Sequence, residues 1–191
     1  MKDKTFNIMG IDPGSRNVGV CIYELNGKLE VISLITYTLY IDTTKNEEEH
    51  KGIHDNILER TNKLESIIKM LYYLYNPLMV AMESSFINMN RMGAVIPLTK
   101  SIHSIESILY SIDKHIKILS IPPGVIKKVF NSKQVGKDAV LTALGNNEML
   151  IAKLDRKKEI SEHEVDAIAI AYTLLEFIKT SEGMICIRFL T

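Results

Sequence analysis

The sequence predicts an α/β fold in which a central, mixed five-stranded sheet is flanked by helices. Short apolar runs that end on turn residues alternate with longer segments whose apolar residues recur at helical spacing. The first three apolar runs follow one another with only turns between them, which is typical of an antiparallel meander. Helix-like segments separate the later runs, and this alternation is typical of crossover connections in an α/β sheet.

Five segments have the composition of strands. Asp12-Pro13-Gly14-Ser15 is a turn sequence between the first two, and Asn26-Gly27 is a strong signal for a two-residue hairpin before the third. The fourth segment is continuously apolar, as in a strand buried on both faces of a sheet. Pro122-Pro123 closes the fifth. The expected strands are 6–11, 18–25, 29–40, 78–82 and 116–121.

Helices are expected between and after these strands. Apolar residues recur at near-helical spacing from Ile53 to Tyr75, and Asn76-Pro77 stops that helix. Ser161 and Glu164 have the spacing of a capping box ahead of the last apolar run. The expected helices are about 53–75, 97–114, 125–130, 136–144 and 161–178.

Length and composition indicate one domain over residues 1–191. The chain has 191 residues, 46% of them hydrophobic, which suits a single compact core. No run of about 18 apolar residues occurs, so no membrane span is expected. The N-terminus has no signal-peptide pattern, and Cys21 and Cys186 read as buried, reduced thiols. A cytoplasmic protein is therefore expected.

Charge is balanced overall but unevenly distributed. The chain carries 23 basic and 23 acidic residues, which does not by itself indicate a nucleic-acid-binding protein. Residues 110–160 hold ten Lys and Arg against five acids, whereas residues 41–65 hold seven acids against four bases. A polarised surface is one interpretation, and ordinary solvated faces are the other.

Three acidic residues occupy the ends of predicted elements. Asp12 directly follows an apolar strand, although Asp-Pro-Gly turns are common. Glu83 ends the most apolar strand, where the chain would also simply emerge into solvent. Asp166 lies in the first turns of the last helix, where the helix dipole favours an acid. Each residue alone has an ordinary structural explanation.

Together the three acids predict a metal site. Reactive groups of open α/β sheets gather at strand ends, so Asp12 and Glu83 would converge if their strands were neighbours. Alanines at 167, 169 and 171 would let the last helix approach the sheet and bring Asp166 to the same place. Clustered carboxylates repel one another and favour hard cations such as Mg²⁺ or Mn²⁺. Two such ions per site would support phosphodiester hydrolysis, so a metal-dependent endonuclease is expected.

His163 is the preferred fourth member of this site. It precedes Asp166 by three residues and therefore shares its helix face, where an imidazole would bind metal or carry a proton. Glu162 also reaches that face, so the choice between the two stays open. Glu164 is assigned to the helix cap. The His and Cys spacing gives no structural zinc motif.

These residues resemble the motifs of the RuvC-type Holliday junction resolvases, in the same order and context. The matching segments are Gly10-Ile11-Asp12-Pro13-Gly14-Ser15, Glu83-Ser84-Ser85-Phe86 and His163-Glu164-Val165-Asp166-Ala167, and the resemblance spans roughly residues 6–178. It implies an RNase H-like fold and a homodimer that grips a four-way DNA junction. It also implies paired, symmetric nicks that require Mg²⁺ or Mn²⁺.

The resemblance also implies roles for individual residues. Those matching the catalytic, metal-binding set are Asp12, Glu83, His163 and Asp166, with Lys127 as an accompanying cation. Those matching DNA-contacting positions are Ser15, Arg16, Asn17, Phe86, Lys127 and Lys137. Phe86 would stack on unpaired bases near the crossover, and the lysines would contact phosphates.

Two segments depart from the family pattern. Residues 42–56 resemble an acidic insertion, and the apolar residues 183–191 resemble an added C-terminal strand. Both fit the bacteriophage-encoded branch of the family, which would place the protein in the host cell cytoplasm.

Other functions stay open at this point. The same acids would serve a nuclease of flaps, Y-forks or RNA–DNA hybrids, and an RNase H-like domain can also be a non-catalytic nucleic-acid-binding module. A nucleotide-binding fold shares the strand-turn-strand opening, but the chain is short for its two-lobed form.

The helix expected over 97–114 is the candidate dimer helix. It carries an apolar stripe that would bind a second subunit or, alternatively, pack on the sheet. The stripe consists of Ile102, Ile105, Ile108, Leu109 and Ile112.

Overall fold

A mixed five-stranded sheet forms the centre of the computed structural model, which describes residues 5–41, 53–84, 92–130, 136–143 and 160–180. The strand order is β3-β2-β1-β4-β5. β1 pairs antiparallel with β2 and β2 with β3, whereas β1–β4 and β4–β5 are parallel pairs. The strands are β1 (Phe6–Asp12), β2 (Asn17–Leu25), β3 (Val31–Tyr40), β4 (Pro77–Glu83) and β5 (Lys117–Ile121). The predicted meander and crossover units are confirmed.

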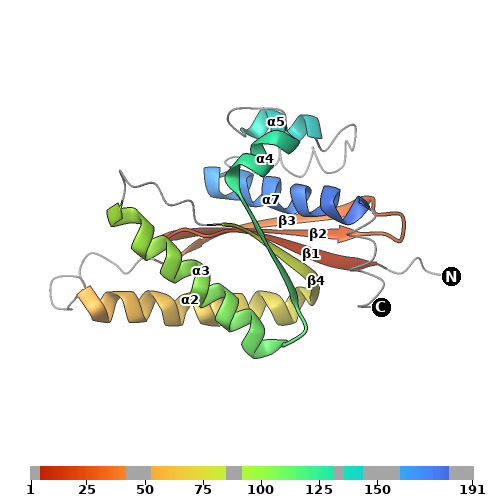
Figure 1. Cartoon of the computed structure of the whole chain (residues 1–191). Coiled ribbons are helices and arrows are strands. Elements are labelled where there is room, and N and C mark those ends of the chain that lie inside the picture. Colours follow the sequence, from red (N-terminus) through yellow and green to blue (C-terminus); the bar gives the residue numbers. More distant parts are fainter. Residues whose placement is uncertain (1–4, 42–52, 85–91, 131–135, 144–159, 181–191) are drawn as a thin grey trace.

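Helices cover both faces of the sheet (Figure 1). α2 and α3 lie on one face over a buried cluster that includes Met9, Val80 and Leu109. α7 lies on the other face over a second cluster, with α4 and α5 beyond it. The helices are α2 (Ile53–Tyr75), α3 (Met92–Ile112), α4 (Pro123–Val129), α5 (Lys137–Ala143) and α7 (Glu162–Lys179). None of the helices in the described ranges is long and apolar enough to cross a membrane.

The loop between β2 and β3 differs from the predicted two-residue turn. The pairing of Leu25 with Val31 leaves five residues between the strands, and the positive φ of 63° falls on Leu29 instead of Gly27. The side-chain oxygen of Asn26 accepts hydrogen bonds from the backbone N–H groups of Lys28 (2.9 Å) and Glu30 (3.0 Å). This local capping by an Asn side chain stabilises a wider loop, so the Asn-Gly signal overstated how tight the turn is.

The helix α3 begins five residues before its predicted start at Pro97. The sequence predicts this helix over about 97–114, from the helical spacing of its apolar residues. Pro97 is the sixth residue of α3, where a proline N–H is absent from the backbone hydrogen-bond ladder.

The apolar stripe on α3 packs inside the subunit. Ile102, Ile105, Ile108 and Leu109 are buried in the cluster beneath α2 and α3, and Ile112 is partly buried against it. The stripe therefore covers the sheet, as in the alternative interpretation, and does not offer a free surface to a second subunit.

Candidate active site

The sheet places Asp12 and Glu83 side by side. β1 and β4 are parallel neighbours, and their register pairs Ile11 with Met82. The residues that follow these two are Asp12 and Glu83, so both carboxylates leave the sheet at the same edge. The sequence predicted that Asp12 and Glu83 would converge if their strands were neighbours, and β1 and β4 are neighbours.

Two glycines let α7 rest directly on the strands. A Cβ atom at Gly10 would lie 2.5 Å from the carbonyl oxygen of Ala167, and one at Gly19 would lie 1.9 Å from that of His163. Both distances are too short for a side chain. Small residues on the strands and on the helix therefore set a close approach that brings His163 and Asp166 toward Asp12. The alanines of α7 predicted this contact, whereas no sequence pattern indicated its glycine partners on the strands.

The N-terminus of α7 is held by the predicted capping box. The Ser161 hydroxyl oxygen accepts from the Glu164 N–H (3.1 Å), and the Glu164 carboxylate accepts from the Ser161 N–H (3.1 Å). Glu164 is buried, which confirms its assignment to the cap. The Ser161 hydroxyl also lies 2.6 Å from the Thr38 hydroxyl on β3. This second contact ties the start of α7 to the sheet.

His163 forms a direct link between α7 and the turn after β1. Its Nδ1 atom lies 2.9 Å from Oδ2 of Asp12, whose residue is only 8% exposed. The pair supports the preference for His163 at the fourth position. Glu162 is exposed, but its charge acts on Asp12 and Asp166, so it lies near the same cluster.

Burial and mutual repulsion disfavour the charged forms of the three acids. Burial raises the pKa of Glu83 to about 7, and the carboxylates of Asp12 and Asp166 contribute, while Lys127 opposes the shift. Burial, followed by the charge of Asp12, raises the pKa of Asp166 to about 6. Burial also raises the pKa of Asp12, although the hydrogen bond from His163 opposes it. Such a cluster is stabilised by positive charge.

The donor set suits a hard divalent cation. Three carboxylates with one imidazole are ligands that Mg²⁺ and Mn²⁺ accept in proteins. The part of the chain that the structure describes contains no three His, Cys, Asp or Glu side chains that already form an ion-binding group. The chemistry of the residues, three carboxylates and an imidazole, nevertheless fits such an ion.

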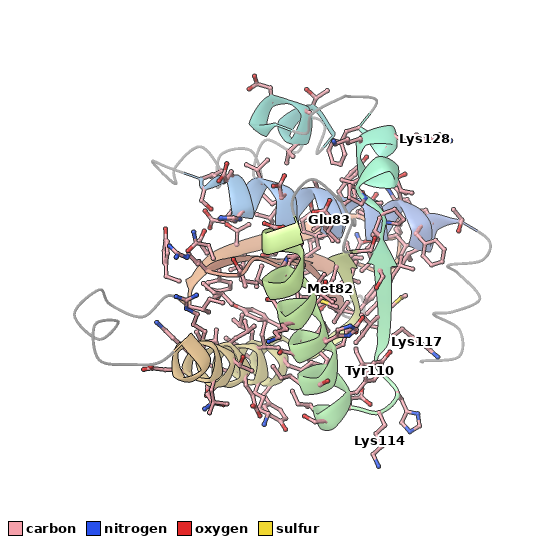
Figure 2. The ribbon with its side chains drawn as sticks, turned by 60° about the vertical axis from the view of Figure 1, so that its left-hand side comes forward. Met82, Glu83, Tyr110, Lys114, Lys117 and Lys128 are labelled. Carbon is pink, nitrogen blue, oxygen red and sulfur yellow. The ribbon has the colours of Figure 1, made fainter. Side chains whose placement is uncertain are left out.

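Four of the six predicted DNA-contacting residues lie next to the acids in the chain or in space. Ser15 and Arg16 are exposed in the turn after Asp12, and Asn17 begins β2. Lys127 is exposed on α4 and lies near enough to Glu83 to lower its pKa. Figure 2 shows α4, with Lys128 on it, above the labelled Glu83. Lys137 is the first residue of α5. Phe86 lies outside the described residues.

Ser101 supports the turn after Asp12, and no sequence motif indicates this residue. This buried residue of α3 donates a hydrogen bond from its hydroxyl to the carbonyl oxygen of Gly14, at 3.0 Å. It fixes the turn between Asp12 and Asn17 from the other face of the sheet. A serine in an apolar helix face was the available signal, but its partner lies 87 residues away in the chain.

Comparison with known proteins identifies the family. The family model described as crossover junction endodeoxyribonuclease RuvC matches residues 8–174. The chain belongs to the RuvC family. Its curated relatives include RuvC from Sulfurovum sp. (strain NBC37-1), 32% identical over 179 residues, with 91% of this chain and 97% of that protein covered. RuvC from Orientia tsutsugamushi (strain Ikeda) is 29% identical over 169 residues, with 87% and 92% covered.

Solved structures of the RuvC type share the fold. T. thermophilus RuvC in complex with a Holliday junction substrate superposes with a TM-score of 0.68 at 16% identity, covering 92% of this chain and 96% of that one. The yeast mitochondrial Holliday junction resolvase Ydc2 gives 0.57 at 16% identity, covering 95% and 85%. The predicted RNase H-like fold is confirmed.

Membership in the RuvC family also confirms the prediction of an endonuclease. The curated relatives named above are bacterial, so they do not distinguish the bacteriophage-encoded branch.

Proposed function

We propose that this RuvC-family endonuclease resolves four-way DNA junctions by paired, metal-dependent hydrolysis of two phosphodiester bonds. The observation that carries the proposal is the meeting of Asp12, Glu83, His163 and Asp166 at one edge of the sheet, in a chain that matches the family from the first strand into the last helix. Each subunit would supply one such site and make one of the two cuts.

The residues divide the chemistry among them. Asp12, Glu83 and Asp166, with His163, would hold the divalent ions. Two Mg²⁺ or Mn²⁺ ions, when bound, supply activation of water and stabilisation of the leaving oxygen. The His163 imidazole orients the Asp12 carboxylate through their hydrogen bond. Lys127, which already lowers the pKa of Glu83, places positive charge where the phosphate gains negative charge.

The substrate contacts follow the same edge. Ser15 and Arg16 in the turn after Asp12, with Asn17 at the start of β2, would bind the backbone beside the scissile phosphate. Lys137 would bind phosphate from the start of α5, and Phe86 would stack on an unpaired base. All five are proposed contacts.

A cleavage assay tests the function. Labelled four-way DNA should be cut by symmetric paired nicks in Mg²⁺ or Mn²⁺ and left intact in EDTA. The same assay with flaps, Y-forks, linear duplex and RNA–DNA hybrids measures selectivity. Faster cutting of flaps or forks than of the junction would replace the proposal with the alternative, a nuclease of other branched DNA. Junction binding without cutting in either metal would indicate a non-catalytic module.

Paired cutting requires two sites, so we propose that the protein is a homodimer. The stripe on α3 is buried, but α2 exposes Met70, Tyr73 and Leu74 on one side of its last turns. Residues three and four apart share a helix face, so these side chains form one apolar patch, of a kind that commonly marks protein interfaces. We propose that the second subunit packs on this patch.

Light scattering tests the proposed dimer. The free protein should have twice the 21.6 kDa mass of the chain, and Leu74→Glu should reduce it to the monomer mass. Lys28→Glu, at an exposed position in the loop between β2 and β3, provides the control and should remain a dimer. A monomeric wild-type protein, or a dimeric Leu74→Glu variant, would contradict this interface.

We further propose that residues 1–191 act as one domain in the cytoplasm and that the chain belongs to the bacteriophage-encoded branch of the family, hence to the host cell cytoplasm. The acidic segment 42–56 and the apolar segment 183–191, the two departures from the family pattern, support the branch assignment.

A further inference from the structure

The last residue of β3 is an exposed aromatic beside the catalytic turn. Tyr40 is 65% exposed, although it ends a regular strand. It pairs across the sheet with Asn17, and the N–H of the next residue, Ile41, donates to the carbonyl oxygen of Arg16 at 2.9 Å. Tyr40 is therefore fixed next to the turn that carries Asp12.

The strand alternation sets the direction of the Tyr40 side chain. Thr38, two residues earlier, directs its hydroxyl to Ser161 at the start of α7, and Leu39 is buried on the opposite face of the sheet. Because side chains two apart in a strand point to the same face, Tyr40 points to the α7 side. Tyr40 lies two residues beyond Thr38 along β3.

The neighbours of this position belong to the active site. Gly19, the cross-strand partner of Thr38, lies against the His163 backbone. The pair of Asn17 and Tyr40 lies two residues along both strands from the pair of Gly19 and Thr38, which contacts the start of α7. The exposed Tyr40 ring therefore lies on the α7 side of the sheet, where Asn17 continues into the turn after Asp12.

We propose that Tyr40 is a base-stacking residue of the DNA site, which receives an unpaired base next to the phosphate that is cut. The inference rests on the proposed function and adds a residue to it. Aromatic rings bind unpaired bases by stacking, whatever the base, and a tyrosine presents this surface with few rotatable bonds. Backbone contacts from Arg16 and Asn17 would hold the adjacent phosphates while the ring stacks. The hydrogen bond from Ser101 to Gly14 holds the neighbouring turn in place.

Binding of a four-way junction by metal-free protein tests the inference without cleavage. Tyr40→Leu keeps an apolar side chain and removes the ring, and should weaken junction binding about tenfold, within the range that one stacked base contributes. Tyr40→Phe keeps the ring and should bind within about twofold of wild type, since the stacking surface is unchanged. Neither variant should alter binding of linear duplex, which has no unpaired base.

Tyr110→Leu is the matched control. Tyr110 is also exposed, at 46%, and lies near the C-terminal end of α3, in the lower part of Figure 2, whereas Glu83 lies in the upper part. This variant should bind the junction as wild type does. A second measurement places 2-aminopurine at the crossover. Its fluorescence in the complex should change on Tyr40→Leu and should be the same for wild type and Tyr40→Phe.

The outcomes separate the inference from the proposed function. Wild-type affinity and fluorescence in Tyr40→Leu, together with normal junction cutting, would overturn the inference alone. An equal loss in Tyr40→Phe would assign the effect to the hydroxyl and overturn stacking. A wild-type protein that binds the junction no better than duplex, and does not cut it, would overturn the proposed function.

Discussion

Asp12→Asn should abolish cutting of a four-way junction while leaving junction binding largely intact. The substitution preserves the size of a buried side chain but removes one negative charge from the cluster with Glu83 and Asp166. Losing the transition-state charge stabilisation that depends on this carboxylate should slow cutting by at least about 10³-fold. Binding depends mainly on contacts to the DNA backbone, which the substitution does not touch.

Single-turnover cleavage and junction affinity, measured on the same preparation, check this result. Glu83→Gln and Asp166→Asn should behave alike. The informative control is Glu162→Gln, which removes a nearby charge from an exposed side chain. It should keep most of the activity, whereas His163→Ala should lose most of it, because His163 contacts Asp12 directly. Wild-type cutting by Asp12→Asn would remove the basis of the active-site assignment, and the reverse ranking of the last two variants would make Glu162 the fourth ligand.

Gly19→Ala should destabilise the protein and displace the start of α7. The added methyl group would lie 1.9 Å from the carbonyl oxygen of His163, which is backbone and cannot rotate away. Overpacking of this kind costs about 1–3 kcal/mol of the free energy of unfolding, and sometimes more. Because the displaced segment carries His163 and leads into Asp166, we expect cleavage to fall even at temperatures where the variant is folded.

Urea unfolding and single-turnover cleavage measure the two parts of this prediction. Gly27→Ala is the matched control, since a methyl group at Gly27 has no neighbour within 4 Å. Its free energy of unfolding should stay within about 0.5 kcal/mol of wild type, as for most surface substitutions. If Gly19→Ala unfolded at the wild-type urea concentration and cut at the wild-type rate, the close approach of α7 would not be required for the site.

Local chemistry made much of this fold predictable. The capping box at Ser161 acts within four residues, and the apolar strand that ends on Glu83 is contiguous, so short sequence windows contain both signals. The loop after β2 is longer than predicted because the Asn26 side chain accepts hydrogen bonds from two backbone N–H groups. The apolar stripe on α3 is buried because α3 packs on the sheet. The sequence pattern does not say which partner an apolar face meets.

By itself, the sequence determined the order of elements, the three acids at element ends and the motifs that carry the family resemblance. Only the tertiary structure decided that β1 lies beside β4, that α7 packs directly on Gly10 and Gly19, and that Tyr40 pairs with Asn17 across the sheet. The physical reason is the range of the interactions. Caps, turns and apolar periodicity act between residues close in the chain, whereas the convergence of Asp12 with His163 joins residues 151 positions apart and depends on the packing of the whole sheet and helix.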